Sequence, residues 1–117
     1  AQVTVAARSL RDRARIESAG LAAVDTAQLA QAVQGREIIF NTVPAPLLTG
    51  EILRALTPSC IVIDLASMPG GVAPDADPPT GCRVIHALSL PGKVAPRTAA
   101  AAIYATVTAI LREEGVL

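Results

Sequence analysis

The sequence contains few aromatic side chains and no tryptophan. Aromatics make up 2% of its 117 residues, with one phenylalanine and one tyrosine, although 51% of the residues are hydrophobic. Any core must therefore be built from alanine, valine, isoleucine and leucine. Short aliphatic runs of this kind are typical of parallel sheets that are covered on both faces.

An excess of charge of either sign is also absent. Ten basic and ten acidic residues cancel to a formal net charge of zero, which argues against a nucleic-acid surface. No apolar run reaches the ~18 residues that a membrane-spanning helix needs, and no secretory leader is recognisable. We therefore expect one domain, residues 1–117, in the cytoplasm, with no nucleic-acid partner and no membrane.

Cysteine is scarce, and its spacing excludes the common cysteine motifs. Cys60 and Cys82 each stand at the start of an apolar run. They form neither a zinc-binding spacing nor a redox pair, so we expect no metal site. Small buried hydrophobes are the simpler interpretation.

Apolar runs alternate with helix-like segments along the whole chain. This alternation predicts a parallel α/β sheet with right-handed crossovers. The expected strands are 2–7, 21–24, 37–42, 60–65 and 83–87, and the expected helices are 10–19, 26–33, 47–56 and 97–114. Segment 72–81, with three prolines, is expected to be a loop. In the last helix, the apolar stripe of Ile103, Val107, Ile110 and Leu111 is expected to face a sheet.

The end of the first strand indicates which nucleotide would fit. In dinucleotide-binding folds the second strand usually ends in an acidic residue that binds the adenosine ribose. Here the strand leads into Arg8 and Ser9, with Arg11 one turn further on. A guanidinium pairs well with a 2′-phosphate, so this pattern favours NADP over NAD. The alternative is a solvated, arginine-rich helix start.

The glycine-rich turn G-x-G-x-x-G does not occur in the sequence. If 2–7 is the second strand of a dinucleotide fold, the chain holds a Rossmann-like, doubly wound parallel sheet without its first strand, Gly loop and helix. In the strand order 3-2-1-4-5-6 that first strand is central. We therefore expect unpaired strand edges, with rearranged pairing, a swapped dimer or disorder at the amino end. Binding of NADP by this chain is expected to be weak or absent.

Polar and small residues follow the next two strands. Thr42 ends the strand 37–42 and is followed by Val43 and Pro44, and Ala66 and Ser67 come after 60–65. In open α/β sheets ligands bind at the carboxyl ends of strands, so these residues are candidate cofactor contacts, with Ser67 also a candidate for the substrate. A plain turn is the alternative interpretation for 42–44.

Two titratable residues lie at strand ends. Asp64 is better interpreted as a carboxylate that caps a loop than as a catalytic base. His86, the only histidine, lies in an apolar strand and is interpreted as structural rather than as a general acid. The catalytic residue is therefore not assigned.

The segment 89–99 contains two prolines and one glycine between the last strand and the final helix. It is expected to be a rigid loop at the carboxyl edge. Pro91 and Val94 are candidate cofactor contacts. Lys93 and Arg97 are candidates for binding a carboxylate substrate, and solvated charges are the alternative.

Three motifs in this order resemble a known family: N-T-V-P-A-P at 41–46, D-L-A-S-M-P-G-G at 64–71 and A-L-S-L-P-G-K-V-A-P-R-T-A at 87–99. They are similar to the carboxyl-terminal nucleotide-binding domain of the dipicolinate synthase A subunit. The sequence departs from the family pattern at Met68, where a basic residue is common, and in its prolines at 72–81.

The resemblance implies an NADP-dependent oxidoreductase of endospore-forming bacteria. In that family a dihydrodipicolinate-type dicarboxylate from the lysine pathway is oxidised to dipicolinate, and the dipicolinate synthase B subunit is the partner. A homo-oligomer is also expected. The resemblance implies a further amino-terminal region, so the 117 residues alone are expected to be inactive.

Two alternative enzyme families and one alternative without catalysis are open. Methylenetetrahydrofolate dehydrogenases share a P-G-x-V-x-P-x-T loop before the last helix, and 2-hydroxyacid dehydrogenases share the general architecture. A non-catalytic nucleotide-fold or assembly module is the alternative outside the enzymes.

Overall fold

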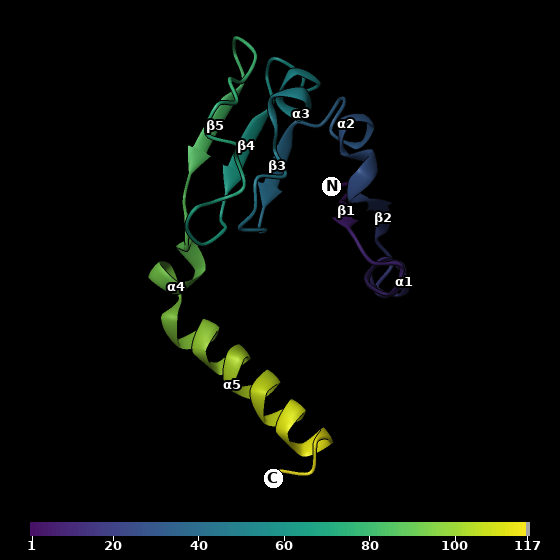
Figure 1. Ribbon diagram of the computed structural model, residues 1–117, viewed down its shortest axis with the longest axis vertical. Helices are drawn as coiled ribbons and strands as arrows, with labels where there is room; N and C mark the ends of the chain where they lie inside the picture. Colours follow the sequence, from purple (N-terminus) through teal and green to yellow (C-terminus); the bar gives the residue numbers. More distant parts are fainter. Residues whose placement is uncertain (117) are drawn as a thin grey trace.

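Two parallel sheets form the framework of the protein (Figure 1). The computed structural model describes residues 1–116. The elements are β1 (Thr4–Ala7), α1 (Leu10–Ser18), β2 (Ala22–Asp25), a 3₁₀ turn (Thr26–Gln28), α2 (Leu29–Ala32), β3 (Ile38–Asn41), α3 (Gly50–Arg54), β4 (Ile61–Asp64), β5 (Arg83–His86), α4 (Leu90–Val94) and α5 (Pro96–Glu113). Strands and helices alternate as the sequence predicts.

The sheets are ordered β1-β2 and β3-β4-β5, with every pair parallel. Placed in one line, β2-β1 followed by β3-β4-β5 is the doubly wound order with its central strand left out. The predicted Rossmann-like fold is confirmed in this partial form. β1 and β3 each keep one edge with no strand beside it among residues 1–116. The predicted rearrangement of pairing, or disorder at the amino end, is wrong, because β1 pairs with β2 in regular register.

The core belongs almost entirely to the three-stranded half. Its fully buried members are Leu53 of α3, Cys60 and Val62. They are joined by Val33, Leu48, Ile52 and Leu56 in one cluster. By contrast, α1 contains no buried residue, and no position of β1 or β2 is buried. Burial of Cys60 confirms the prediction for that cysteine, while Cys82 is half-buried, and both thiols are free.

Local hydrogen bonds fix the residues at which the helices begin. Ser9 caps α1, since its Oγ accepts from the Asp12 N–H at 3.0 Å and donates to the Asp12 carboxylate. Asp25 caps the 3₁₀ turn through the Ala27 N–H. Thr49 caps α3, which therefore begins at Gly50 and not at 47 as predicted. Leu48 instead pairs with the segment after β4, because its N–H donates to the Gly71 carbonyl.

The chain after β5 departs from the prediction. The expected rigid loop at 89–99 contains the helix α4 and the first turn of α5. A proline is tolerated in the first turn of a helix, where its missing N–H has no partner to lose, and Pro96 opens α5 in this way.

Helix α5 extends away from both sheets and packs against α4 (Figure 1). The predicted apolar stripe therefore does not face a sheet: Ile103, Val107 and Ile110 are 64, 48 and 52% exposed, and Leu111 is half-buried. The prediction is wrong because α4 turns the chain off the end of β5. Within the described residues, no helix is long and apolar enough to cross a membrane.

Candidate functional site

The carboxyl ends of β3, β4 and β5 lie side by side. Asn41 is in register with Asp64, and Asp64 with His86. The parallel register therefore brings together three of the predicted groups at one edge: the turn 42–44, the loop that begins at Ala66, and α4. Loops at this edge of an open α/β sheet form the ligand site.

A buried carboxylate connects two of these loops. Asp64 is 1% exposed and accepts hydrogen bonds from Asn41 Nδ2 at 2.9 Å and from the backbone N–H groups of Gly71 (2.8 Å) and Ala66 (3.3 Å). Asn41, also buried, donates to the Val43 carbonyl at 2.9 Å. One carboxylate thus fixes the loop after its own strand and, through Asn41, the turn after β3.

The surroundings of Asp64 also set its charge. Burial alone would raise the pKa of this carboxyl. The hydrogen bonds from Asn41, Gly71 and Ala66, together with the nearby His86, outweigh burial and hold the pKa below its usual value. Asp64 is therefore an ionised structural anchor, as its predicted capping role suggests. No buried polar side chain of residues 1–116 lacks a hydrogen-bond partner.

Two glycines make this contact possible. A Cβ on Gly71 would lie 1.8 Å from Asn41 Nδ2, and one on Gly70 would lie 2.7 Å from Asp64 Oδ2. Gly70 also has a φ of +90°, which disfavours other residues. The two glycines therefore let the backbone of this loop pack closely against Asp64 and Asn41.

The loop from 66 to 71 divides into a buried and an exposed part. Ala66 is 3% exposed and packs in the interior, while Ser67 and Met68 are exposed. Ser67 is thus placed to contact a ligand with its side chain. Thr42, Val43 and Pro44, which follow β3, are likewise exposed. The roles predicted for these residues stay predictions.

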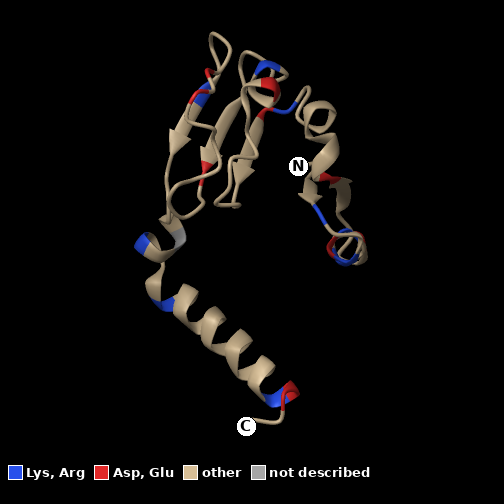
Figure 2. Cartoon of the chain, viewed as in Figure 1, with Lys and Arg blue, Asp and Glu red and all other residues tan. Residues whose placement is uncertain are grey.

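In the two-stranded sheet, β1 leads into the arginine-rich start of α1. The side chains of Arg8 and Arg11 are exposed, whereas the Ser9 hydroxyl is engaged with Asp12 as a cap. Figure 2 shows positive charge directly after β1 and again on α4 and the start of α5. Arg8 and Arg11 therefore remain available for an anionic ligand, and Ser9 is available chiefly through its backbone.

Arg13 has a role that sequence reasoning missed. Its Nη1 donates to Asp25 Oδ2 at 2.6 Å and to the carbonyls of Ala7 and Arg8 at 3.1 and 2.9 Å. It thereby joins the carboxyl ends of β1 and β2. Arginine occurs at every second position of this segment, at 11, 13 and 15. The sequence alone does not indicate which of the three side chains points toward the strand ends.

The segment after β5 presents the predicted substrate residues. Lys93 and Val94 of α4 and Arg97 of α5 are exposed. Pro91 was predicted beside them, but its side chain lies outside the described part of the structure. His86 is exposed at the end of the edge strand β5, so it is not enclosed as its apolar neighbours suggested.

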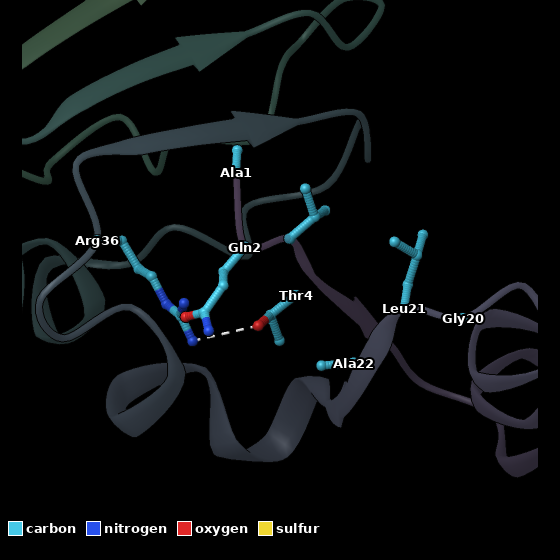
Figure 3. Close-up of a pocket in the computed structure, with 8 residues that line it drawn as sticks. Ala1, Gln2, Thr4, Gly20, Leu21, Ala22 and Arg36 are labelled. Atoms are coloured by element: carbon cyan, nitrogen blue, oxygen red, sulfur yellow. Dashed lines mark hydrogen bonds between the residues drawn. The ribbon is translucent and has the colours of Figure 1, made fainter.

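Two hollows adjoin β1. The smaller, about 460 Å³, lies at the amino ends of β1 and β2, and Arg36 there donates to Thr4 Oγ1 at 3.2 Å (Figure 3). This is the edge away from the predicted ligand site. The larger, about 760 Å³, lies between β1 and β3. No group of three metal-binding side chains occurs among the described residues.

Parallel strands connected by helices, in the order found here, define the class as a partial Rossmann-like α/β fold. No protein-family model matches the chain. The chain is 36% identical over 113 residues, 97% of its length, to the A subunit of dipicolinate synthase from Bacillus subtilis.

Solved structures agree. The crystal structure of the Bacillus subtilis dipicolinate synthase A chain matches with a TM-score of 0.75 and 36% identity over 97% of this chain. The corresponding dipicolinate synthase structure from Bacillus halodurans matches with a TM-score of 0.75 and 32% identity over 95%. The chain spans 38% of the length of each of these relatives. Over the region that it matches, the chain is similar in sequence and in structure to dipicolinate synthase A subunits, which confirms the predicted resemblance.

Proposed function

We propose that this chain is the cofactor- and substrate-facing half of an NADP-dependent oxidoreductase that forms dipicolinate. The observation that carries the proposal is the match to the dipicolinate synthase A chain over 97% of the sequence. The exposed groups at the carboxyl edge support it, because they suit a phosphorylated cofactor and a dicarboxylate.

Cofactor choice follows from the residues after β1. Arg8 and Arg11 are exposed cations, and no carboxylate occupies the first position after β1 that would repel a 2′-phosphate. Thr42, Val43 and Pro44, together with Ser67, would form the wall along the rest of the cofactor, and the buried Ala66 would support this wall from the interior. NADP supplies a hydride acceptor when bound.

Substrate binding is assigned to the segment after β5. Lys93 and Arg97 lie on adjacent helices, α4 and α5, and both side chains are exposed. Two cations suit a small substrate with two carboxylates, and Ser67 offers a hydroxyl nearby. The dihydro ring would lose a hydride to the cofactor and a proton to solvent, which balances its oxidation to dipicolinate.

The proposal also includes a partner subunit, an oligomeric state and a location in the cell. The similarity to dipicolinate synthase A subunits favours a partner of the dipicolinate synthase B type, a homo-oligomer and a cytoplasmic role in sporulation, and all three are proposals for this chain. The 117 residues form a partial dinucleotide-binding domain in this view, inactive without further sequence.

The test uses the complete protein that contains this chain, supplied with freshly formed dihydrodipicolinate. NADPH formation is expected, and failure to reduce NADP would contradict the assignment. Arg8→Ala should raise the KM for NADP about tenfold or more, through loss of ~1.4 kcal/mol of phosphate binding. It should leave the KM for NAD unchanged. Arg15→Ala, at an exposed arginine within α1, is the matched control.

A further inference from the structure

The two cysteines of the chain lie opposite each other on neighbouring strands, which their spacing in the sequence did not indicate. The strands β4 and β5 are parallel neighbours, with Ile61 in register with Arg83 (Figure 1). The residues one place earlier, Cys60 and Cys82, are therefore opposite each other. A hydrogen bond from the Arg83 N–H to the Cys60 carbonyl, at 3.0 Å, fixes this register at the amino ends of the two strands.

Both cysteine side chains belong to the same face of the sheet. Because side chains alternate between the two faces along a strand, Cys60 shares a face with Val62, and Cys82 shares a face with Val84. Cys60 and Val62 are fully buried in the core, and Cys82 and Val84 pack against that core. The two thiols therefore lie together on the core face of the sheet.

The spacing of the two strands suits a disulfide bond. Neighbouring strands lie about 4.8 Å apart, and the Cα atoms of disulfide-linked cysteines lie about 4.4–6.8 Å apart. The chain is also close to itself just before the strands, because a Cβ on Gly81 would lie 2.9 Å from the Pro58 carbonyl oxygen. A bond between Cys60 and Cys82 therefore requires little movement of the backbone.

The two thiols differ in exposure, and this difference sets the order in which they react. Cys82 is half-buried, whereas Cys60 is fully buried. Burial raises the pKa of both thiols, and the nearby Cys82 raises the pKa of Cys60 further. Both groups therefore rest as thiols at neutral pH, and an oxidant in solution reaches Cys82 first.

We propose that Cys60 and Cys82 are a redox-active pair that a low-molecular-weight disulfide converts to a disulfide bond between β4 and β5. The Cys82 thiolate attacks the small disulfide, one of its sulfurs leaves as a thiol, and a mixed disulfide forms on Cys82. Cys60 then attacks the Cys82 sulfur and releases the second thiol. The protein loses two electrons and two protons, and the two released thiols carry them.

The bond would fasten the last strand of the three-stranded sheet. Within residues 1–116, β5 pairs with β4 alone, and it leads into α4 and α5, which carry Lys93 and Arg97. The cysteines lie at the amino ends of β4 and β5, whereas the candidate ligand site lies at the carboxyl ends. Oxidation is therefore expected to stabilise β5 and to leave the candidate site open. The inference does not depend on the proposed activity.

The test incubates the complete protein that contains this chain with glutathione disulfide, alkylates the free thiols and maps the peptides by mass spectrometry. Trypsin releases residues 55–83 as one peptide with both cysteines, and cleavage before Asp64 and Asp77 then separates them. We expect Cys60 and Cys82 to resist alkylation and to stay joined after both digestions until dithiothreitol is added. A stable glutathione adduct on Cys82, or full alkylation of both cysteines, would overturn the proposal.

A redox titration measures whether the fold favours the bond. In mixtures of oxidised and reduced glutathione, the folded protein should form the bond at a ratio of oxidised to reduced glutathione at least about tenfold lower than the protein in concentrated urea. The reason is that a bond that fits the native structure is itself stabilised by folding. Equal ratios in the two conditions would contradict the pairing of Cys60 with Cys82 in the native sheet.

Two variants test the order of attack and the register. Cys60→Ser leaves no second thiol to resolve the mixed disulfide, so a glutathione adduct on Cys82 should accumulate, and its absence would contradict the order of attack. The double variant Cys82→Ser with Arg83→Cys moves the thiol to the opposite face of β5 and should abolish the bond. If this double variant forms the bond as readily as the unmodified protein, the proposal is wrong.

Discussion

The three-stranded half of the molecule is held by buried contacts, and the two-stranded half is held by contacts at its surface. β3, β4 and β5 share a core centred on Leu53 and Val62, together with a buried carboxylate at their carboxyl ends. β1, β2 and α1 have no buried residue. Caps and one arginine fix their shape. Local hydrogen bonds can therefore define strands and helices where burial does not stabilise them.

The largest expected difference between the halves comes from removing a core side chain. Leu53→Ala deletes a leucine that is 0% exposed and should lower the free energy of unfolding by about 2–5 kcal/mol. Leu10→Ala, in α1 where Leu10 is 75% exposed, should change it by less than ~0.5 kcal/mol. Urea denaturation followed by circular dichroism measures both. Similar losses would remove the distinction between the halves.

A smaller effect is expected from crowding the buried carboxylate. Gly71→Ala places a methyl group on Asn41 Nδ2, so Asn41 and the loop must move, at a cost of about 1–3 kcal/mol. Gly92→Ala is the matched control in α4, where a Cβ meets nothing within 4 Å, and it should be neutral or stabilising by ~0.5–1 kcal/mol. Thermal unfolding compares the two. A neutral Gly71→Ala would contradict the close contact.

The charge of Asp64 predicts a pH dependence of stability. Because its pKa is lowered in the folded state, its contribution is present above the ordinary aspartate pKa of about 3.9. It is lost as the pH falls toward the folded value. Asp64→Asn should remove this acid-side loss and should cost about 1–3 kcal/mol at neutral pH, since the amide faces the Gly71 N–H.

Urea midpoints across the acid range test this prediction. Asp77→Asn, in the exposed loop after β4, is the control and should keep the profile of the unmodified protein. If Asp64→Asn and the unmodified protein lose stability in parallel, the carboxylate is not the anchor of the two loops.

The smallest effect is expected in the two-stranded half. Arg13→Ala removes the contact to Asp25 and two bonds to strand-end carbonyls, at a cost of about 1 kcal/mol, since the pair is only partly buried. Faster amide exchange should be confined to β1 and β2. Arg15→Ala, exposed on the same helix, should have no such effect. Faster amide exchange throughout β3–β5 would show that the two halves do not unfold independently.

Features that depend on neighbours in sequence were predictable. The caps at Ser9, Asp25 and Thr49 follow from side chains that reach two or three residues ahead. The strands follow from short aliphatic runs. The separation of β1-β2 from β3-β4-β5 was expected, because the sequence contains no G-x-G-x-x-G turn.

Features that depend on strand register or tertiary packing were not predictable. The Asn41–Asp64 bond joins residues 23 apart in the chain, and only the register of β3 with β4 brings them together. The direction of α5 depends on α4. This short helix was not predicted, because the two prolines in 89–99 indicated a loop. The contacts of Arg13 with Asp25 and the strand ends could not be predicted, because Arg11 and Arg15 are equally good candidates by sequence.

We propose that this chain carries the carboxyl-edge residues of a cofactor site, while a strand and glycine-rich turn that could hold the pyrophosphate are not found among residues 1–116. The decisive measurement is a calorimetric titration of the chain with NADPH. We expect weak binding or none for the 117 residues alone. A dissociation constant in the micromolar range would show that the proposal is wrong.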